Sequence, residues 1–321
     1  MSTRVLLSMF HVQNRLFRLQ DRAAMLRAAR EYFHDRGIME VDCPLVSPRA
    51  SIDAHIDLVP ADEQRFLHSS PEYGMKRLLA EGIGDIYQLS HVFRSGEFGQ
   101  RHNPEFMMAE WYRLGITFEE MIDETVEFIE LFIGRSRMSQ MTYRDMFLHY
   151  TGIDVASSSI ESLRTYCENK RINMYRGIDE EGIDAYLNLI LGAKIEPHLG
   201  HDHIFVVTHY PATQAALAQK AWINDFEVAR RFEIYHKGLE LANGYHELAD
   251  ATEQRQRLLD ANAHRLVLEK EALPIDENFL KALEKGLPDC CGVAVGFDRC
   301  LMLRHDVQSI EEVIPFDWNT A

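Results

Sequence analysis

Residues 93–112 read FRSGEFGQRHNPEFMMAEWY and carry the strongest structural signal of the chain. They cover the end of one predicted strand, Ile86 to Arg94, and most of a second, Glu105 to Leu114, with a polar loop between the two. The other predicted strands also come in clusters that are separated by helical blocks, so regular alternation of strands and helices is absent. This order favours an α+β fold with a mostly antiparallel sheet flanked by helices.

Helix and strand signals extend outward from this hairpin in both directions. Apolar spacing predicts a first helix from about Val12 to Arg36. Ser70-Pro71-Glu72 has the composition of a helix start with Ser70 as the N-cap, and Thr117 with Glu120 is typical of a capping box. The other expected elements are a mostly helical stretch from about Thr142 to Leu199, strands at His203 to Thr208, around Phe232 to Glu247 and at Gly292 to Phe297, and two helices between Thr252 and Lys285.

Composition places the chain among globular proteins, because 46% of its 321 residues are hydrophobic and 26% are charged. The formal net charge of −16 argues against a broad RNA- or DNA-binding face, although a few arginines suffice for a nucleotide pocket. The five cysteines form no C-x-x-C pair, and the sequence shows no signal peptide or apolar run of membrane-spanning length. We therefore expect a cytoplasmic protein with reduced thiols and no membrane partner.

The predicted hairpin places a carboxylate in unusual company. Because side chains alternate along a strand, Glu110 shares one face with Phe106, Met108 and Tyr112. A carboxylate among apolar and aromatic groups needs a cation or hydrogen-bond donors around it. The ordinary alternative is a solvated loop with its charges in water, but the nearby Arg94 favours a binding site.

Three glutamates recur at intervals of seven residues farther along the chain. A turn near Lys237-Gly238 would bring Glu233 and Glu240 together, whereas Glu247 lies at the far end of the second strand. Two close carboxylates suit a hard cation, and Mg²⁺ that bridges phosphates is the usual case. The alternative is an edge strand whose acids are solvated.

A third segment, Gly292-Val293-Ala294-Val295-Gly296-Phe297-Asp298-Arg299, reads as a buried strand that runs into a helix. Glycines in such a strand allow a flat group to approach the backbone. Neither G-x-x-x-x-G-K-[ST] nor G-x-G-x-x-G is present, so the two common nucleotide motifs do not apply.

Together these segments resemble the signature motifs of class II aminoacyl-tRNA synthetases, and those of the lysyl enzyme in particular. Gly37 to Pro44 resembles motif 1, the dimer-forming strand, Phe93 to Tyr112 resembles motif 2, and Gly292 to Arg299 resembles motif 3. The segment from Arg231 to Glu247 is also close to the lysyl pattern. The resemblance extends from about Leu16 to Leu303 and implies a class II catalytic core in a homodimer.

The anticodon-binding barrel of lysyl-tRNA synthetase has no counterpart here, so residues 1–321 are expected to form a single class II synthetase-like catalytic domain. A free-standing core of this length resembles the elongation factor P–lysine ligases. That resemblance implies an AMP-forming ligase that uses ATP and Mg²⁺ and attaches lysine, preferably β-lysine, to a lysine side chain of elongation factor P. With a net charge of −16, tRNA is not an expected partner.

The resemblance also implies residue roles. Arg94 and Arg299 are the expected catalytic residues, at the α-phosphate with the substrate carboxylate and at the γ-phosphate, and Phe106 is expected to stack on adenine. The remaining expected ATP-binding residues are Ser95, Gly96, Glu97, His102, Asn103, Glu240, Leu241 and Gly296. The expected substrate-binding residues are Ser70, Pro71, Glu72, Glu110, Tyr112, Asn243, Glu247 and Ala294, and the expected Mg²⁺ ligands are Glu233 and Glu240.

Within the substrate set, Glu72 and Glu110 are expected to face the amine at the reacting end. Glu247 and the Tyr112 hydroxyl are expected to face the distal ammonium.

Two positions depart from the lysyl pattern. The lysyl pattern has Arg-x-Glu in motif 2, whereas here Arg94 is followed by Ser95-Gly96-Glu97. The acid at the adenine edge is therefore either displaced to Glu97 or replaced by backbone contacts. Ala294 stands where the synthetase has glycine, and its methyl group would favour a β-amino acid. Two other functions stay open, a regulatory paralogue that senses lysine or tRNA and an amide ligase of the asparagine synthetase type.

Overall fold

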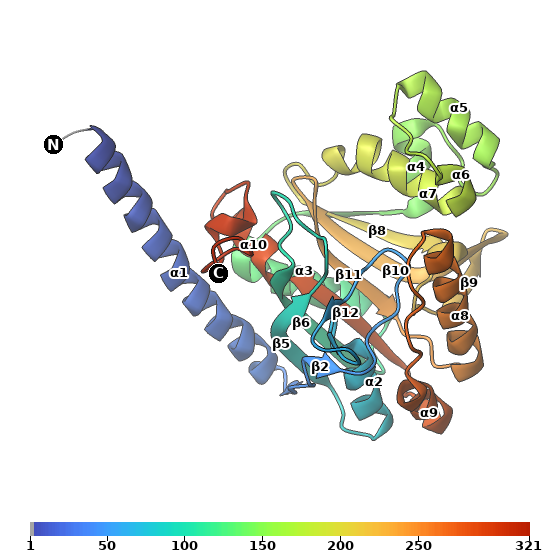
Figure 1. Ribbon diagram of the computed structural model, residues 1–321, viewed down its shortest axis with the longest axis horizontal. Coiled ribbons are helices and arrows are strands. Elements are labelled where there is room, and N and C mark those ends of the chain that lie inside the picture. Colours follow the sequence, from blue (N-terminus) through green and yellow to red (C-terminus); the bar gives the residue numbers. More distant parts are fainter. Residues whose placement is uncertain (1–2) are drawn as a thin grey trace.

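The computed structural model describes the backbone of residues 3–321 and the side chains from Asn14 onward. Its centre is a nine-stranded mixed sheet in the order β1-β5-β6-β12-β11-β10-β8-β7, with β9 paired to β10 (Figure 1). The pairs β1–β5 and β7–β8 are parallel and all other pairs are antiparallel. The predicted α+β class with a mostly antiparallel sheet is confirmed.

The strands of this sheet are β1 (Met39–Glu40), β5 (Ile86–Phe93), β6 (Glu105–Leu114), β7 (Met138–Thr142), β8 (Ile204–Pro211), β9 (Lys220–Ile223), β10 (Phe226–His236), β11 (Leu239–His246) and β12 (Cys290–Gly296). A small second sheet holds β2 (Val46–Ser47), β3 (Val59–Pro60) and β4 (Phe66–Leu67). The α-helices are α1 (Thr3–Asp35), α2 (Glu72–Ala80), α3 (Phe118–Ile133), α4 (Tyr143–Thr151), α5 (Ile160–Lys170), α6 (Ile178–Glu181), α7 (Ile183–Ile190), α8 (Ala251–Val267), α9 (Glu277–Gly286) and α10 (Phe297–Arg304).

Three helices cover one face of the sheet and leave the other for chemistry. Side chains of α1, α3 and α10 join those of β5, β6, β11 and β12 in one large apolar core. Phe33 of α1, Trp111 of β6 and Phe128 of α3 are fully buried there, and their ring centroids lie 5.2–5.3 Å apart. Because strand side chains alternate, Glu110 next to Trp111 faces the opposite side.

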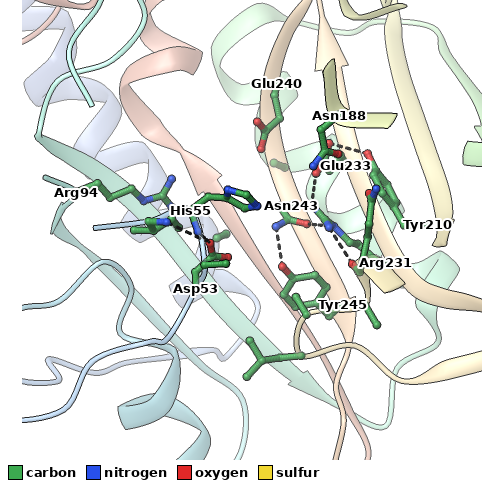
Figure 2. Close-up of a pocket in the computed structure, with 18 of the residues that line it drawn as sticks. Asp53, His55, Arg94, Asn188, Tyr210, Arg231, Glu233, Glu240, Asn243 and Tyr245 are labelled. Atoms are coloured by element: carbon green, nitrogen blue, oxygen red, sulfur yellow. Dashed lines mark hydrogen bonds and ion pairs between the residues drawn. The ribbon is translucent and has the colours of Figure 1, made fainter. Parts of the chain in front are cut away.

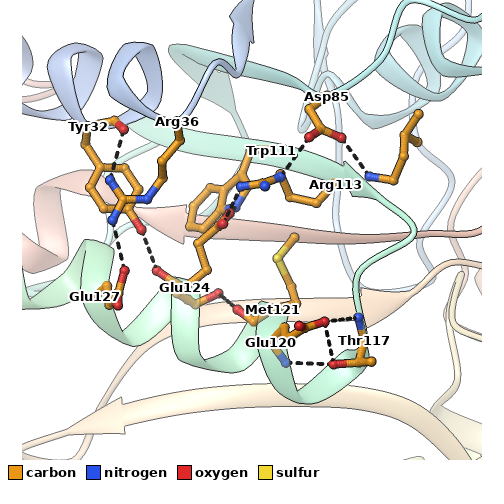
Figure 3. A network of polar contacts seen from close by, with 12 residues as sticks. Tyr32, Arg36, Asp85, Trp111, Arg113, Thr117, Glu120, Met121, Glu124 and Glu127 are labelled. Atoms are coloured by element: carbon orange, nitrogen blue, oxygen red, sulfur yellow. Dashed lines mark hydrogen bonds and ion pairs between the residues drawn. The ribbon is translucent and has the colours of Figure 1, made fainter.

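A polar network anchors β6 from behind (Figure 3). Trp111 Nε1 donates to Glu124 Oε1 of α3 at 2.8 Å, and Arg113 bonds both Glu124 and, at 3.0 Å, Asp85. These contacts fix the strand that carries Glu110 to the helix layer. The capping box of Thr117 and Glu120 is present at the start of α3, as predicted.

Other helices close the two ends of the polar face. Helices α2, α8 and α9 pack together over one end, and the helical block α4 to α7 forms a separate core against β8 and β10. Within residues 3–321, no helix is both long and apolar enough to cross a membrane. All five cysteines are free thiols.

Sequence patterns located most elements but missed some ends. Helix α2 begins at Glu72 with Pro71 as its N-cap, one residue later than predicted. The Ser70 hydroxyl still caps this helix end, because it accepts from the Glu72 amide at 3.0 Å, and it also donates to Glu110. The predicted turn at Lys237-Gly238 is confirmed, with φ angles of 51° and 67°.

Candidate active site

A cavity of about 840 Å³ opens on the polar face of the sheet. Figure 2 shows Asp53, His55 and Arg94 on one side of it and side chains of β8, β10 and β11 on the other. The expected nucleotide residues that line it are Arg94, Glu97, His102, Asn103, Phe106, Glu240, Leu241, Gly296 and Arg299, together with Glu233, Asn243 and Ala294. Ser95, Gly96, Ser70, Pro71, Glu72, Glu110, Tyr112 and Glu247 are not among the lining residues.

Two arginines face the cavity at one end, which we call the arginine end and define by Arg94 and Arg299. The Arg94 guanidinium lies over the Phe106 ring, 5.2 Å from its centroid, and the Nε of Arg94 is buried without a hydrogen-bond partner among the described residues. Arg299 Nη1 donates to the Glu240 carbonyl oxygen at 2.9 Å. Guanidinium groups beside an aromatic face suit a nucleotide, with the ring for the base and the cations for phosphates.

His102 completes the arginine end as an acceptor. Arg299 Nη2 donates to His102 Nε2 at 2.8 Å. Burial and the adjacent Arg299 charge hold the pKa of His102 below its ordinary value, so its ring is neutral at neutral pH. Glu97, 3.8 Å from Arg94, lines the cavity, whereas Gly96 does not. Of these two residues, only Glu97 therefore lies at this wall.

Three carboxylates and one lysine form a buried group that we call the acid cluster. It consists of Glu72 and Lys76 of α2, Glu110 of β6 and Glu247. Lys76 Nζ lies 2.6 Å from Glu72 Oε1 and 2.6 Å from Glu247 Oε2, and the side chain of Lys76 is 0% exposed. Lys76 is therefore the group that compensates the charge of Glu247.

Glu110 is held by hydroxyl groups instead of a cation. Ser70 Oγ donates to Oε2 at 2.8 Å and the Tyr112 hydroxyl donates to Oε1 at 2.7 Å. Burial and the neighbouring Glu72 raise the pKa of Glu110 to about 7. Burial, with Glu72 adding to it and Lys76 opposing it, raises the pKa of Glu247 to about 8. When all three carboxylates are ionised, the cluster holds more negative charge than its single lysine can balance, and the raised pKa values of Glu110 and Glu247 reflect this excess.

The two glycines of β12 serve different neighbours. A Cβ on Gly292 would lie 2.3 Å from Glu247 Oε1 and 2.4 Å from the Tyr112 ring. Gly292 thus admits parts of the chain itself, not the flat ligand that the sequence suggested. A Cβ on Gly296 would meet only the Arg299 side chain, at 3.5 Å, so this glycine keeps the cavity wall flat.

Glu233 lies in a chain of hydrogen bonds across β10 and β11 (Figure 2). It accepts from Tyr210 at 2.6 Å, from Tyr235 at 2.5 Å and from Arg231 at 2.5 Å. Arg231 also donates to Asn243 Oδ1 at 3.1 Å. Three donors on one carboxylate leave Glu233 little free acceptor capacity.

Glu240 has a second acidic neighbour, Glu196, from the short helix η2 (Glu196–His198). Burial, then Glu240 and Glu233, raise the pKa of Glu196 to about 7. Partial burial and Glu233 raise the pKa of Glu240, although Arg299 opposes this. A divalent cation would relieve this repulsion, so the donor set fits Mg²⁺ with phosphate oxygens as further ligands. Among residues 3–321, no three His, Cys, Asp or Glu side chains are close enough to hold a metal by themselves.

The family model for tRNA synthetases class II (D, K and N) matches residues 3–320. The chain belongs to this family. Curated relatives named elongation factor P–(R)-β-lysine ligase include those of Haemophilus influenzae (strain PittGG), 42% identical over 312 residues, and Klebsiella pneumoniae (strain 342), 41% identical over 312 residues. The match to each covers 94% of this chain and 95% of the relative.

Sequence reasoning within the class II pattern missed several residues of this site. Lys76 was overlooked, although its position four residues after Glu72 on a helix predicts a pair. Arg231 lay inside the quoted lysyl-like segment, yet its partner Tyr210 comes from β8 and no local pattern links them. Glu196 belongs to the helical block, and only the folded chain brings it beside Glu240.

Proposed function

We propose that this chain is an ATP-dependent, AMP-forming ligase that activates lysine, preferably β-lysine, and transfers it to a lysine side chain of elongation factor P. One observation carries the proposal: a nucleotide-type arginine end and a lysine-type acid cluster share one sheet face, in a chain about 40% identical to ligases of that name. We propose that residues 1–321 act in the cytoplasm as one catalytic domain.

In the first step a carboxylate oxygen of the amino acid attacks the α-phosphorus of ATP and pyrophosphate leaves. Arg94 is the proposed contact to the α-phosphate and substrate carboxylate, Arg299 to the γ-phosphate, and Phe106 to adenine. No protein nucleophile is needed, because positioning and charge stabilisation suffice. Bound Mg²⁺ would neutralise phosphate charge, and Glu240 would hold it with Glu196 and phosphate oxygens, while Glu233, whose oxygens already accept from three donors, would act through its charge.

The acid cluster supplies the charge argument for the substrate class. Three carboxylates against one lysine leave two negative charges when all are ionised. Lysine and β-lysine each bring two ammonium groups, which balance those charges. We propose Glu72 and Glu110 for the amine at the reacting end and Glu247 with Tyr112 for the distal ammonium, reached through the wall at Asn243 and Ala294.

The second step distinguishes this proposal from a tRNA synthetase. A lysine amine of the acceptor protein, not a ribose hydroxyl, attacks the adenylate. The net charge of −16 provides no broad basic face for tRNA. A protein loop that presents one lysine needs only access to the cavity.

We propose a homodimer through the segment that resembles motif 1. Apolar side chains are exposed on α1 and β1, with Leu16 57%, Phe17 62% and Met39 43% accessible. Figure 1 shows α1 as a long helix whose N-terminal half extends away from the body. The molar mass of the protein in solution tests this directly.

ATP–pyrophosphate exchange with α-lysine, β-lysine and aspartate separates the three functions. The proposed ligase exchanges with a lysine isomer, a regulatory paralogue with none, and an asparagine-synthetase-like ligase with aspartate. Incubation with ATP and β-lysine in the presence of elongation factor P and of tRNA then identifies the acceptor. Mass spectrometry should find a lysyl adduct on the protein, and efficient tRNA charging without that adduct would contradict the proposal.

A further inference from the structure

One wall of the cavity belongs to neither the arginine end nor the acid cluster. It consists of the loop Ile52–Ile56 and one side of α8, both of which line the cavity opposite the strands. The loop carries His55 and the helix carries His264, and their ring centroids lie 5.4 Å apart in an edge-to-face arrangement. Two imidazoles thus meet at this wall of the cavity.

The backbone that presents His55 is fixed tightly. Arg265, 4% exposed, donates from Nη1 to the carbonyl oxygens of Asp53 at 2.9 Å and Ile56 at 3.0 Å. The Asp53 carboxylate accepts from the His55 amide at 2.7 Å and closes the turn. Lys270 Nζ donates to the His55 carbonyl oxygen at 3.2 Å. The loop is therefore held to α8 while the imidazole of His55 stays exposed.

Several other polar groups of this wall and of the cavity are already engaged. Asp53 closes the turn, Asp260 accepts from Gln256 at 2.9 Å, and Glu97 pairs with Arg94. His102 accepts from Arg299. Neither imidazole of the His55–His264 pair donates to or accepts from another described residue by a hydrogen bond, and the Nε2 of His264 is also shielded from solvent. A buried polar atom without a partner calls for a functional explanation.

We propose that His55 is the general base for the acceptor amine and that His264 positions the His55 ring. Figure 2 shows His55 projecting from its loop toward the space between Arg94 and Asn243. This inference rests on the proposed function, because it assigns the proton of the second step.

The proton balance of the step is simple. The lone pair of the neutral acceptor nitrogen forms the new C–N bond, and the nitrogen becomes positively charged. The C–O bond to the phosphate breaks and AMP leaves with that electron pair. The imidazole of His55 takes the excess proton from nitrogen as the amide forms and later releases it to water. Imidazole suits this role because its ordinary titration lies between pH 5 and 8.

Charges of both signs surround this pair. They are Asp53 and Asp57 of the loop, Asp260 and Arg265 of α8, Lys270 after the helix, and Arg94 across the cavity.

The experiment separates transfer from activation. The adenylate is formed first from ATP and β-lysine, and single-turnover transfer is followed to elongation factor P and, separately, to Nα-acetyl-lysine amide. His55→Asn should leave ATP–pyrophosphate exchange unchanged and slow transfer to both acceptors by about 100-fold at pH 7. The part of the rising limb of the pH–rate profile that reports the imidazole should be lost, while the part that reports deprotonation of the acceptor amine remains. The transfer rate of the His264→Gln variant should lie between those of His55→Asn and the unaltered enzyme. His149→Asn, on the exposed side of α4, is the matched control.

Hydroxylamine is the decisive third acceptor, because its nitrogen is much less basic than that of an alkyl amine and, after attack, loses its excess proton to water without a catalytic base. The His55→Asn variant should form the hydroxamate at the normal rate. If hydroxamate formation falls as much as transfer to lysine, or if transfer is unaffected, His55 is not the base. If the unaltered enzyme modifies the small amide but not elongation factor P, the proposed acceptor is wrong, and the effect of His55→Asn on the small amide still decides this inference.

Discussion

The arginine end and the acid cluster differ in how their charges are compensated. At the arginine end the pairs are long and partly exposed, with Arg94 3.8 Å from Glu97 and Arg299 3.5 Å from the carboxylate of Glu240. In the acid cluster Lys76 is 0% exposed and contacts two carboxylates at 2.6 Å. Exposed pairs contribute little to stability and exchange partners easily, whereas a buried pair is costly to break. The first set is therefore available to phosphates, and the second is part of the fold.

Removal of the buried cation should have the largest effect. Lys76→Met leaves Glu72 and Glu247 buried without their counter-ion, which should cost about 3–5 kcal/mol of unfolding free energy. Chemical denaturation measures the loss. Lys220→Met is the control, because Lys220 lies 3.6 Å from a partly exposed Glu253 and should change stability by less than about 1 kcal/mol. Equal stability of both variants would show that the ion pairs of the acid cluster contribute no more to the unfolding free energy than a surface pair does.

Removal of an arginine should spare the fold and impair activation. Arg94→Ala should lose about 2–4 kcal/mol of transition-state stabilisation, as expected when one preorganised electrostatic donor is removed. The measurement is ATP–pyrophosphate exchange, with the unfolding transition followed in parallel. Arg135→Ala, whose side chain is 91% exposed, should leave both unchanged. Full exchange activity in Arg94→Ala would remove Arg94 from the proposed mechanism.

The same contrast explains what the sequence could predict. The hairpin β5–β6 and the capping box of α3 depend on local patterns, and both were predicted with nearly correct ends. The alternation rule also placed Glu110 and Tyr112 on one face, and their side chains are hydrogen-bonded. Residues of the arginine end lie in contiguous motifs, so resemblance identified them without knowledge of the fold.

The rest depends on contacts between distant segments. The two-residue turn at Lys237-Gly238 places Glu240 opposite Tyr235, and the β-bulge between Ile234 and Tyr235 then moves the partner of Glu233 from Ala242 to Asn243, which no local pattern predicts. Glu247 packs against Gly292, and Lys76 compensates its negative charge. Its side chain therefore lies behind the cavity wall and does not line the cavity. Burial and compensation of charge are properties of the packed chain, not of a local pattern.

Two glycines on one strand provide a direct comparison. Gly292→Ala places a methyl group 2.3 Å from Glu247 and should cost about 1–3 kcal/mol of stability through overpacking. Gly296→Ala meets only a flexible arginine at 3.5 Å and should keep normal stability. Its effect should be a raised KM for ATP, because the methyl group enters the cavity. Thermal unfolding and exchange kinetics of the two variants measure these effects, and a reversed pattern would exchange the roles assigned to the two glycines.

The smallest expected effect is a dependence of amino-acid affinity on pH. Because the folded protein holds the pKa of Glu110 near 7, above its ordinary value, this group is neutral at pH 6 when folded but ionised when unfolded. Its contribution to stability is therefore present at low pH and falls as pH rises from about 4.5 through 7. A dicationic substrate prefers the ionised carboxyl, so its affinity should change in the opposite sense and rise by about tenfold, or about 1.4 kcal/mol, between pH 6 and 8. Calorimetry with β-lysine in buffers of different ionisation enthalpy should detect proton release, and Glu110→Gln should reduce it. A dissociation constant that stays level from pH 6 to 8 would show that the acid cluster is already ionised before the amino acid arrives.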